Sequence, residues 1–332
     1  MNSILDLYTD YLISSSSYTT ATGLSRLTDG VISHDKITRF LSKNTFTSSD
    51  LWKQAKSLYK LVQSDDGVLI LDDSIEEKPY TDENELISWH HEHTKNRTVK
   101  GINFMSALYE TPKGKVPVCY DLVTKTVDHV NKKTGKKSRK SPISKQKRYQ
   151  NLIKKVIENG VNFRYVLNDS WFSSNENMRF IKKDFKKDFI MPVKSNRLIA
   201  FNKSEQELKK FVRIDSVELG EGALVWLKGL EFPVRFARQV FKDENGVTGI
   251  LYLVSSDFKL TNDQIGLIYK RRWSIEVYHK SLKSNLSLTK SPIEPVVDVC
   301  AMALTANSAR HIANRNIKTF LMCVSFLGKP KN

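Results

Sequence analysis

Cysteine is scarce in this chain of 332 residues. The three cysteines, Cys119, Cys300 and Cys323, are odd in number and far apart in the sequence. A disulfide framework requires paired cysteines and a zinc knuckle requires closely spaced ones, so the pattern argues against both. We therefore expect buried or chemically idle thiols. The length is sufficient for one large domain or two ordinary ones, with an ample hydrophobic core.

Long apolar runs are also missing. Residues 1–17 contain no basic segment followed by a continuous apolar run, which is the pattern of a secretion signal. The longest apolar run near the other end, residues 320–327, is too short to cross a bilayer. These absences predict a soluble, intracellular protein that works in the cytoplasm.

Acidic residues are few relative to basic ones. The chain has 36 Asp and Glu against 53 Lys and Arg, which gives a net charge of +17 and a pI near 9.6. A polyanion is the natural partner of such a surface, and we favour nucleic acid over a membrane.

More than half of this net charge lies in residues 131–148, which contain nine Lys and Arg and no acid. Runs of this kind are usually solvated, mobile loops. A loop of this charge would also bind along a nucleic-acid phosphate backbone, with an affinity that falls steeply as salt rises. A mobile loop can make such contacts, so the two interpretations are compatible. The candidate DNA contacts in this run are Lys136, Lys137, Arg139 and Lys140.

Residues 261–290 are predicted to form one long helix. Thr261 and Gln264 have the spacing of a capping box, and neither Pro nor Gly interrupts the segment between Gly266 and Pro292. At about 100° per residue, four polar side chains fall within about 60° of one another. They are Tyr269, Arg272, Glu276 and Lys283. A second stripe, Ile268, Ile275 and Leu282, keeps an apolar edge toward a core.

An amphipathic helix with a charged outer face would explain these stripes in an arbitrary protein. The order and spacing of four of these residues are more specific than a charged face requires: Tyr269, Arg272, Glu276 and Lys283. They resemble the signature helix of bacterial insertion-sequence transposases, in the lineage of the DDE superfamily that is named for its Y-R-E-K motif. A site of this family also needs two aspartates upstream.

Two short apolar segments are each followed by acids. Residues 67–71 read as a buried strand that ends in Asp72 and Asp73, and residues 163–167 read as another that leads to Asp169. An Asp at such a place is more often a helix cap or a turn residue.

The resemblance assigns catalytic roles to Asp73, Asp169 and Glu276. The family usually has Thr after its first aspartate, and Ser74 follows Asp73, while Asp72 remains the alternative. Many relatives have a small residue where this chain has Trp171.

The segments between these acids are predicted from periodicity. Residues 98–108 and 116–123 indicate a hairpin that turns near Pro112 and Gly114. A helix is predicted for residues 145–159, a second for 173–186 and a strand for 189–193. Strands at 223–227, 232–240 and 249–255 form a β-rich region. It resembles the insertion that these transposases carry before their glutamate.

Some residues allow two interpretations. Trp226 suits either stacking on an unpaired or flipped base or burial in a sheet, and burial is the more common role of a tryptophan. Residues 89–93, Trp-His-His-Glu-His, suggest a metal, but no partner cluster follows at ligand spacing and a polar loop is favoured. Residues 33–43, with Arg39, suit either the recognition helix of a helix-turn-helix unit or an ordinary basic helix. Residues 295–318 suggest a packing helix.

The resemblance implies an α/β, ribonuclease-H-like fold: a mixed sheet flanked by helices, with a β-rich insertion and a small N-terminal helical region. The expected divisions are a helical, DNA-binding region at 1–62, the first part of the catalytic domain at 63–195, the insertion at 196–258 and the glutamate-bearing part at 259–332.

The implied activity is metal-dependent cleavage at the ends of an insertion sequence and strand transfer into target DNA. Asp73, Asp169 and Glu276 would bind Mg²⁺, with Mn²⁺ able to substitute, while Tyr269, Arg272 and Lys283 orient phosphates. Double-stranded DNA, a homodimer on that DNA and association with a bacterial nucleoid follow from the same resemblance. The alternatives are a nuclease of this fold and an inactivated transposase that only binds DNA, although the retained acids argue against inactivation.

Overall fold

A computed structural model describes residues 4–15, 18–43, 46–92, 96–135, 137–242, 246 and 248–285. The chain divides into two compact units. The first unit comprises Met1–Gln63, Asp73–Val161 and Ile275–Asn332, and the second comprises Ser64–Asp72 and Asn162–Ser274. One strand, β1 (Val68–Glu77), contributes residues to both units.

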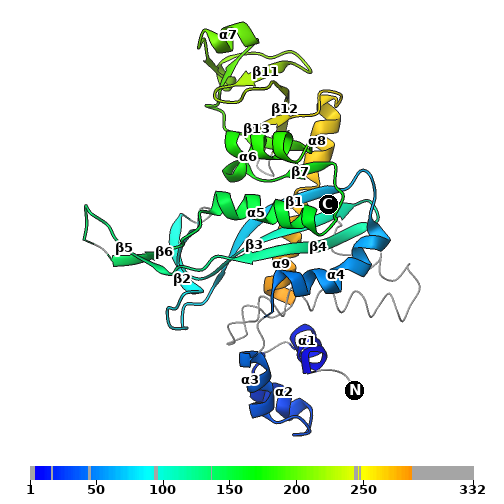
Figure 1. Ribbon diagram of the computed structural model, residues 1–332, viewed down its shortest axis with the longest axis vertical. Coiled ribbons are helices and arrows are strands. Elements are labelled where there is room, and N and C mark those ends of the chain that lie inside the picture. The colour runs from blue at the N-terminus through cyan, green and yellow to red at the C-terminus, as the bar shows by residue number, and fades with distance from the viewer. Residues whose placement is uncertain are drawn as a thin grey trace. The chain divides into compact units, whose positions relative to one another are not determined.

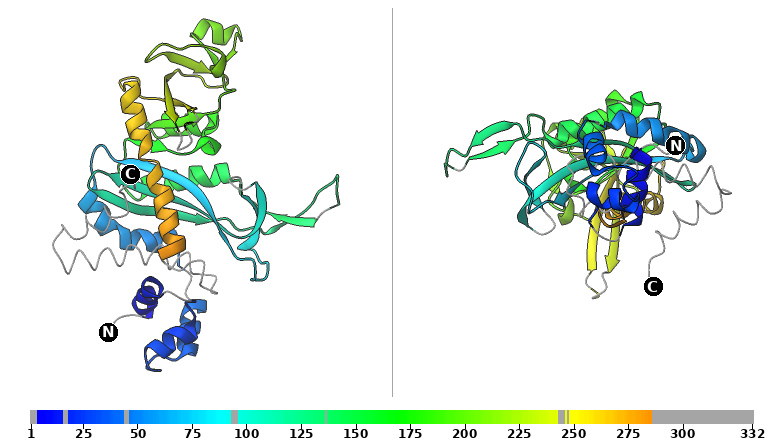
Figure 2. Two further views of the ribbon diagram at one scale, coloured as in Figure 1. Left: turned by 180° about the vertical axis from the view of Figure 1, so that it is seen from behind. Right: turned by 90° about the horizontal axis from the view of Figure 1, so that it is seen from below.

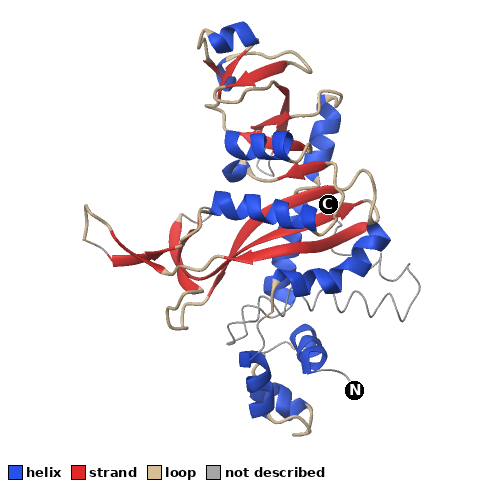
Figure 3. Cartoon of the chain, viewed as in Figure 1, coloured by secondary structure: helices blue, strands red, loops and turns tan. Residues whose placement is uncertain are grey.

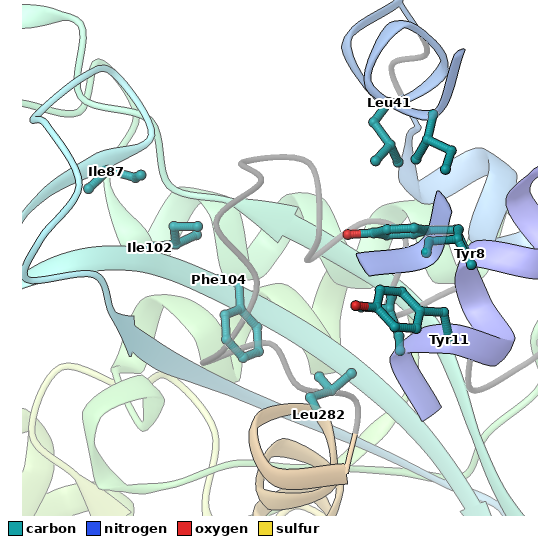
Figure 4. Packing of buried hydrophobic residues seen from close by; sticks show 10 residues of the cluster. Tyr8, Tyr11, Leu41, Ile87, Ile102, Phe104 and Leu282 are labelled. Carbon is teal, nitrogen blue, oxygen red and sulfur yellow. The ribbon is translucent and has the colours of Figure 1, made fainter. Parts of the chain in front are cut away.

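The first unit begins with short helices, drawn in blue in Figure 1. They are α1 (Ile4–Ser14), α2 (Ala21–Leu27), α3 (His34–Lys43) and α4 (Ser48–Val62). The helix predicted at 33–43 is confirmed, and Ser33 Oγ caps it by accepting a hydrogen bond from the Lys36 backbone N–H at 3.3 Å. Tyr8, Tyr11 and Leu41 from these helices join a buried cluster that also contains Phe104 and Leu282 (Figure 4).

A sheet forms the centre of the first unit. The long strand β3 (Arg97–Thr111) pairs antiparallel with β2 (Ile87–Glu92) along one half and with β4 (Gly114–Leu122) along the other. The predicted hairpin is therefore confirmed. The helix α5 (Lys145–Glu158) packs on β3 and β4, and α4 packs on β4. The hydroxyl of Ser48 in α4 contacts the buried thiol of Cys119 at 3.1 Å.

The second unit is built around parallel strands. The beginning of β1 pairs parallel with β7 (Tyr165–Leu167), and β7 pairs parallel with β8 (Asp188–Val193). An antiparallel series continues from β8 in the order β13 (Thr248–Ser255), β12 (Val234–Lys242), β11 (Leu224–Leu227), β9 (Leu198–Ala200) and β10 (Val212–Arg213). Helices and strands are distinguished by colour in Figure 3. The predicted mixed α/β fold with a β-rich segment is confirmed.

Short helical segments connect these strands. They are a 3₁₀ turn at Ser170–Phe172, α6 (Asn175–Arg179), a π-helical turn at Phe180–Asp184, α7 (Lys203–Glu207) and a 3₁₀ turn at Ile214–Ser216, while α8 (Asn262–Lys270) follows the last strand. The helix predicted over 173–186 is therefore shorter and changes its winding. Among the described residues, no helix is both long and apolar enough to cross a membrane.

The prediction that the first strand ends at its aspartates is wrong. β1 continues through Asp72 and Asp73 to Glu77. It continues because β3 lies beside it as a hydrogen-bonded neighbour, and a backbone ladder tolerates polar side chains that have partners.

Two loop predictions are also wrong. Residues 89–92 belong to β2, where pairing with β3 satisfies the backbone, while His93 lies outside the described residues. Part of the basic run forms β6 (Lys137–Lys140), which pairs antiparallel with β5 (Val127–Val130). This β5–β6 pair extends from the rest of its unit in Figure 1. Lys136 and the helix predicted at 295–318 lie outside the described residues.

The single helix predicted over 261–290 is replaced by two helices. α8 ends at Lys270, and α9 (Trp273–Asn285) begins after a turn at Arg271 and Arg272. The backbone N–H groups of these two arginines bond to carbonyls three residues earlier, and the Arg271 guanidinium donates to the Asp66 carbonyl at 3.0 Å. Tightening to i→i−3 bonds changes the rotation per residue, so the polar stripe does not follow one continuous helix. The left view of Figure 2 shows α8, in yellow, and α9, in orange, from behind.

Candidate active site

In the first unit, Asp73 lies within a polar cluster on β1. Its Oδ2 accepts hydrogen bonds from Asn103 Nδ2 on β3 at 2.9 Å and from Lys145 Nζ at 2.6 Å. Asn103 is fully buried, and the Asp73 side chain is 19% exposed. The tertiary fold therefore gives this carboxylate a neutral donor and a cation on one oxygen.

Glu276 lies in the first turn of α9, where a carboxylate is stabilised by the helix dipole. His279 and Lys283 follow at spacings that put them on the same face of the helix, within about 60°. That face is turned toward the sheet of the first unit, since Lys283 Nζ donates to the Ile75 carbonyl on β1 at 2.6 Å. His279 Nε2 shares a 2.6 Å hydrogen bond with Ser106 Oγ on β3.

Two histidines of this unit are buried in uncharged form. Burial, and then the charge of Lys283, lowers the pKa of His279 to about 3, although Asp73 acts in the opposite direction. Burial, followed by the charges of Lys125 and Lys145, lowers the pKa of His90 to about 3. His90 Nε2 is 3.0 Å from Ser88 Oγ. Both imidazoles are therefore structural hydrogen-bonding groups at neutral pH.

The two buried histidines should make the stability of the fold sensitive to acid. A histidine whose folded pKa is depressed stabilises the fold above its unfolded pKa of 6.5, and this stability is lost as pH falls toward 3. Each buried histidine should add a slope of about 1.4 kcal/mol per pH unit to the unfolding free energy in this window. Urea unfolding of wild type and His279→Gln from pH 7 to pH 5 measures the slope. The variant should show a shallower slope, and the exposed His91→Gln serves as its control. Equal slopes in all three proteins would contradict the burial argument.

In the second unit, Asp72 and Asp169 extend from neighbouring parallel strands. Ile70 is in register with Leu167, and each aspartate follows two residues later. Asp169 caps the 3₁₀ turn after β7, with its Oδ1 accepting from the Trp171 and Phe172 backbone N–H groups at 3.1 and 3.4 Å. Trp171 is exposed and takes part through its backbone.

Tyr269 and Arg272 lie in the same part of the second unit. The Tyr269 hydroxyl donates to the Asn168 carbonyl at 3.2 Å, and the Arg272 guanidinium lies 5.8 Å from the Tyr269 ring centroid. Burial raises the pKa of Tyr269, the nearby Arg272 lowers it, and the charges of Asp169 and Asp72 raise it further. The first two residues of the polar stripe are thus close to the predicted second aspartate, although they precede α9.

The other predicted DNA contacts are dispersed. Trp226 is partly buried on β11 opposite Ala200 of β9. Arg39 is exposed on α3, and Lys137 and Lys140 are exposed on β6. Arg139 on β6 pairs with Glu83 at 2.9 Å.

Sequence reasoning missed Asn103, Lys145 and His279 as neighbours of the acids. In the sequence, Lys145 belongs only to the basic run and to the start of a predicted helix. Their roles depend on pairings between residues that are 30, 72 and 173 positions apart. Local patterns contain no signal for such pairings.

The donor chemistry of the proposed ligands fits a hard divalent cation. Asp73, Asp169 and Glu276 are partly exposed carboxylates, which Mg²⁺ prefers. Within the described part of the chain, the buried Asn103 Oδ1 beside Asp73 has no hydrogen-bond partner. An amide oxygen is neutral, but like a carboxylate oxygen it is a hard donor. The described ranges contain no three His, Cys, Asp or Glu side chains close enough together to hold a metal ion.

Comparison with protein families identifies the chain's relatives. A family model described as DDE superfamily endonuclease matches residues 2–207, which is more than half of the chain. The chain belongs to the DDE superfamily. A second model, described as Transposase DDE domain, matches residues 143–307 of this DDE protein. No curated protein matches it. The family supports a transposase or endonuclease function on DNA, and its transposases generally depend on divalent metal ions.

Proposed function

We propose that this DDE protein is the transposase of a bacterial insertion sequence of the Y-R-E-K lineage. It cleaves DNA at the ends of the element and joins them to target DNA. The observation that carries the proposal is the arrangement of the signature residues within each unit. Glu276 shares a helix face with His279 and Lys283, both of which bond to the sheet that contains Asp73. Tyr269 and Arg272 accompany Asp169 in the second unit.

The proposed mechanism uses three carboxylates. Asp73, Asp169 and Glu276 would hold Mg²⁺, or Mn²⁺ in its place, through their carboxylate oxygens. A metal ion held there would supply Lewis-acid stabilisation of the phosphodiester oxygens during displacement. Arg272 orients a phosphate through two parallel hydrogen bonds, and the cationic Lys283 adds positive charge beside β1. Tyr269 fixes the backbone next to Asp169 through its bond to the Asn168 carbonyl.

The remaining proposed DNA contacts comprise basic side chains and one aromatic side chain. Residues 1–62 form the proposed DNA-binding region, with Arg39 exposed on α3. The basic β6 strand follows phosphates, and Trp226 stacks on a base at the transposon end. A homodimer on DNA would bring two ends together, and the protein would act at the nucleoid.

The test is a cleavage assay at fixed salt on DNA that carries the element's own ends. We expect cleavage with Mg²⁺ and none with EDTA. A second substrate, a pre-cut end with a free 3′-hydroxyl, should be joined to target DNA. Cleavage without joining would identify a nuclease of the same fold. End-specific binding without cleavage would identify a DNA-binding protein.

Substitutions of Asp73 and Asp72 are expected to change the cleavage rate by different amounts, because successive side chains of a strand point to opposite faces. We expect Asp73→Asn to lower the cleavage rate by about 10³-fold, as for the loss of a strong electrostatic contributor to the transition state. Asp72→Asn should cost about tenfold or less, since its carboxylate would act through its neighbours. Single-turnover cleavage under Mg²⁺ measures both. The reverse ranking would assign the metal ligand to Asp72.

A further inference from the structure

Lys145 is the ion-pair partner of Asp73. Its Nζ lies 2.6 Å from Asp73 Oδ2, the same oxygen that accepts from Asn103 at 2.9 Å. The two charged side chains are 27% and 19% exposed, so most of the pair is withdrawn from water. An ion pair in this environment is screened less than one on an open surface.

The position of Lys145 in its own helix is unfavourable for a cation. Lys145 is the first residue of α5, after the N-cap Ser144, and the first turn contains no acid. The N–H groups at a helix N-terminus have partial positive charge and repel an ammonium. A second cation, Lys125, also interacts with Lys145. Burial lowers the pKa of Lys125, and the charge of Lys145 lowers it further. Asp73 supplies the negative charge that offsets this arrangement.

We propose that Lys145 is the resident cation of Asp73 in the metal-free protein, and that a divalent cation must displace it to bind there. This inference rests on the proposed role of Asp73 as a metal ligand. Mg²⁺ requires direct contact with carboxylate oxygen at about 2.0–2.1 Å, so it competes with the ammonium for Asp73. Lys145 thereby balances the negative charge of Asp73 before metal binds, and it raises the metal concentration that is needed to occupy the site.

The experiment measures metal binding without any reaction. The full chain, free of DNA, is titrated with Mn²⁺, and the free ion is followed by electron paramagnetic resonance. We expect Lys145→Met to lower the half-saturating Mn²⁺ concentration about fivefold, which is equivalent to about 1 kcal/mol. Lys154→Met is the matched control, since Lys154 lies on α5 in an exposed pair with Glu158 and its change removes the same charge. It should bind Mn²⁺ as wild type does.

A second measurement tests the ion pair itself in EDTA. Urea unfolding of Asp73→Asn, Lys145→Met and the double variant forms a mutant cycle. We expect a favourable coupling between the two residues in this cycle. The absence of coupling would overturn the resident-cation role even if the variants differ in stability.

The titration separates the two proposals. Unchanged or weaker Mn²⁺ binding by Lys145→Met, or no binding by either wild type or this variant, would overturn the displacement. Wild-type Mn²⁺ binding by Asp73→Asn would instead remove Asp73 from the metal ligands, and with it the catalytic assignment. If wild type binds Mn²⁺ as expected but does not cleave DNA, only the proposed function is contradicted.

Discussion

Replacing Glu276 with glutamine is expected to lower metal-dependent DNA cleavage by about 10³-fold or more, while DNA binding is retained. The change removes the negative charge and keeps the size of the side chain. Glu276 is only partly buried, and His279, Lys283 and the buried Leu282 make contacts between α9 and the sheet that this change leaves in place. The fold should therefore survive. Single-turnover cleavage of end-containing DNA, with binding measured at the same salt, gives both quantities.

Glu158→Gln is the matched control for this experiment. Glu158 is the last residue of α5, and it is exposed in a 3.8 Å pair with Lys154. Its replacement makes the same chemical change on a helix that carries no proposed ligand at that end. Wild-type cleavage by Glu276→Gln would remove Glu276 from the mechanism. Equal losses in both variants would indicate a nonspecific effect of charge.

Replacing Gly101 with alanine is expected to destabilise the protein by about 3 kcal/mol. β3 passes so close to β1 at this point that a Cβ atom on Gly101 would overlap the backbone carbonyl of Glu76. Because the obstacle is backbone, it cannot rotate away as a flexible side chain could. The strands must separate, and Asp73 lies three residues before Glu76 on β1. Urea unfolding measures the loss.

Gly220→Ala is the control for backbone entropy. A Cβ on Gly220 would meet no atom within 4 Å, so the change should alter stability by about 1 kcal/mol at most. A Gly101→Ala protein as stable as this control would show that β1 and β3 can separate without cost. If the loss occurs as expected, cleavage should fall with it, because Asp73 shares the displaced strand.

The sequence by itself predicted the elements whose patterns are local. The hairpin of β3 and β4 has turn residues between apolar runs, and α5 has helical periodicity. The strands β11, β12 and β13 were found from alternation and turns. The acids and the polar stripe were identified as a set by resemblance, because their order along the chain is itself a sequence property. Family comparison supports the superfamily, while the roles of the individual residues stay predictions.

Tertiary structure decided what depends on partners far along the chain. β1 continues through its aspartates because β3 lies beside it, and residues 89–92 form a strand for the same reason. The helix predicted over 261–290 is broken where Arg271 reaches the Asp66 carbonyl, 205 residues away in sequence. Lys145 became the partner of Asp73, and His279 became a buried neutral group. Hydrogen bonds and desolvation between distant residues decided these features, and neither is encoded in the spacing of neighbours along the chain.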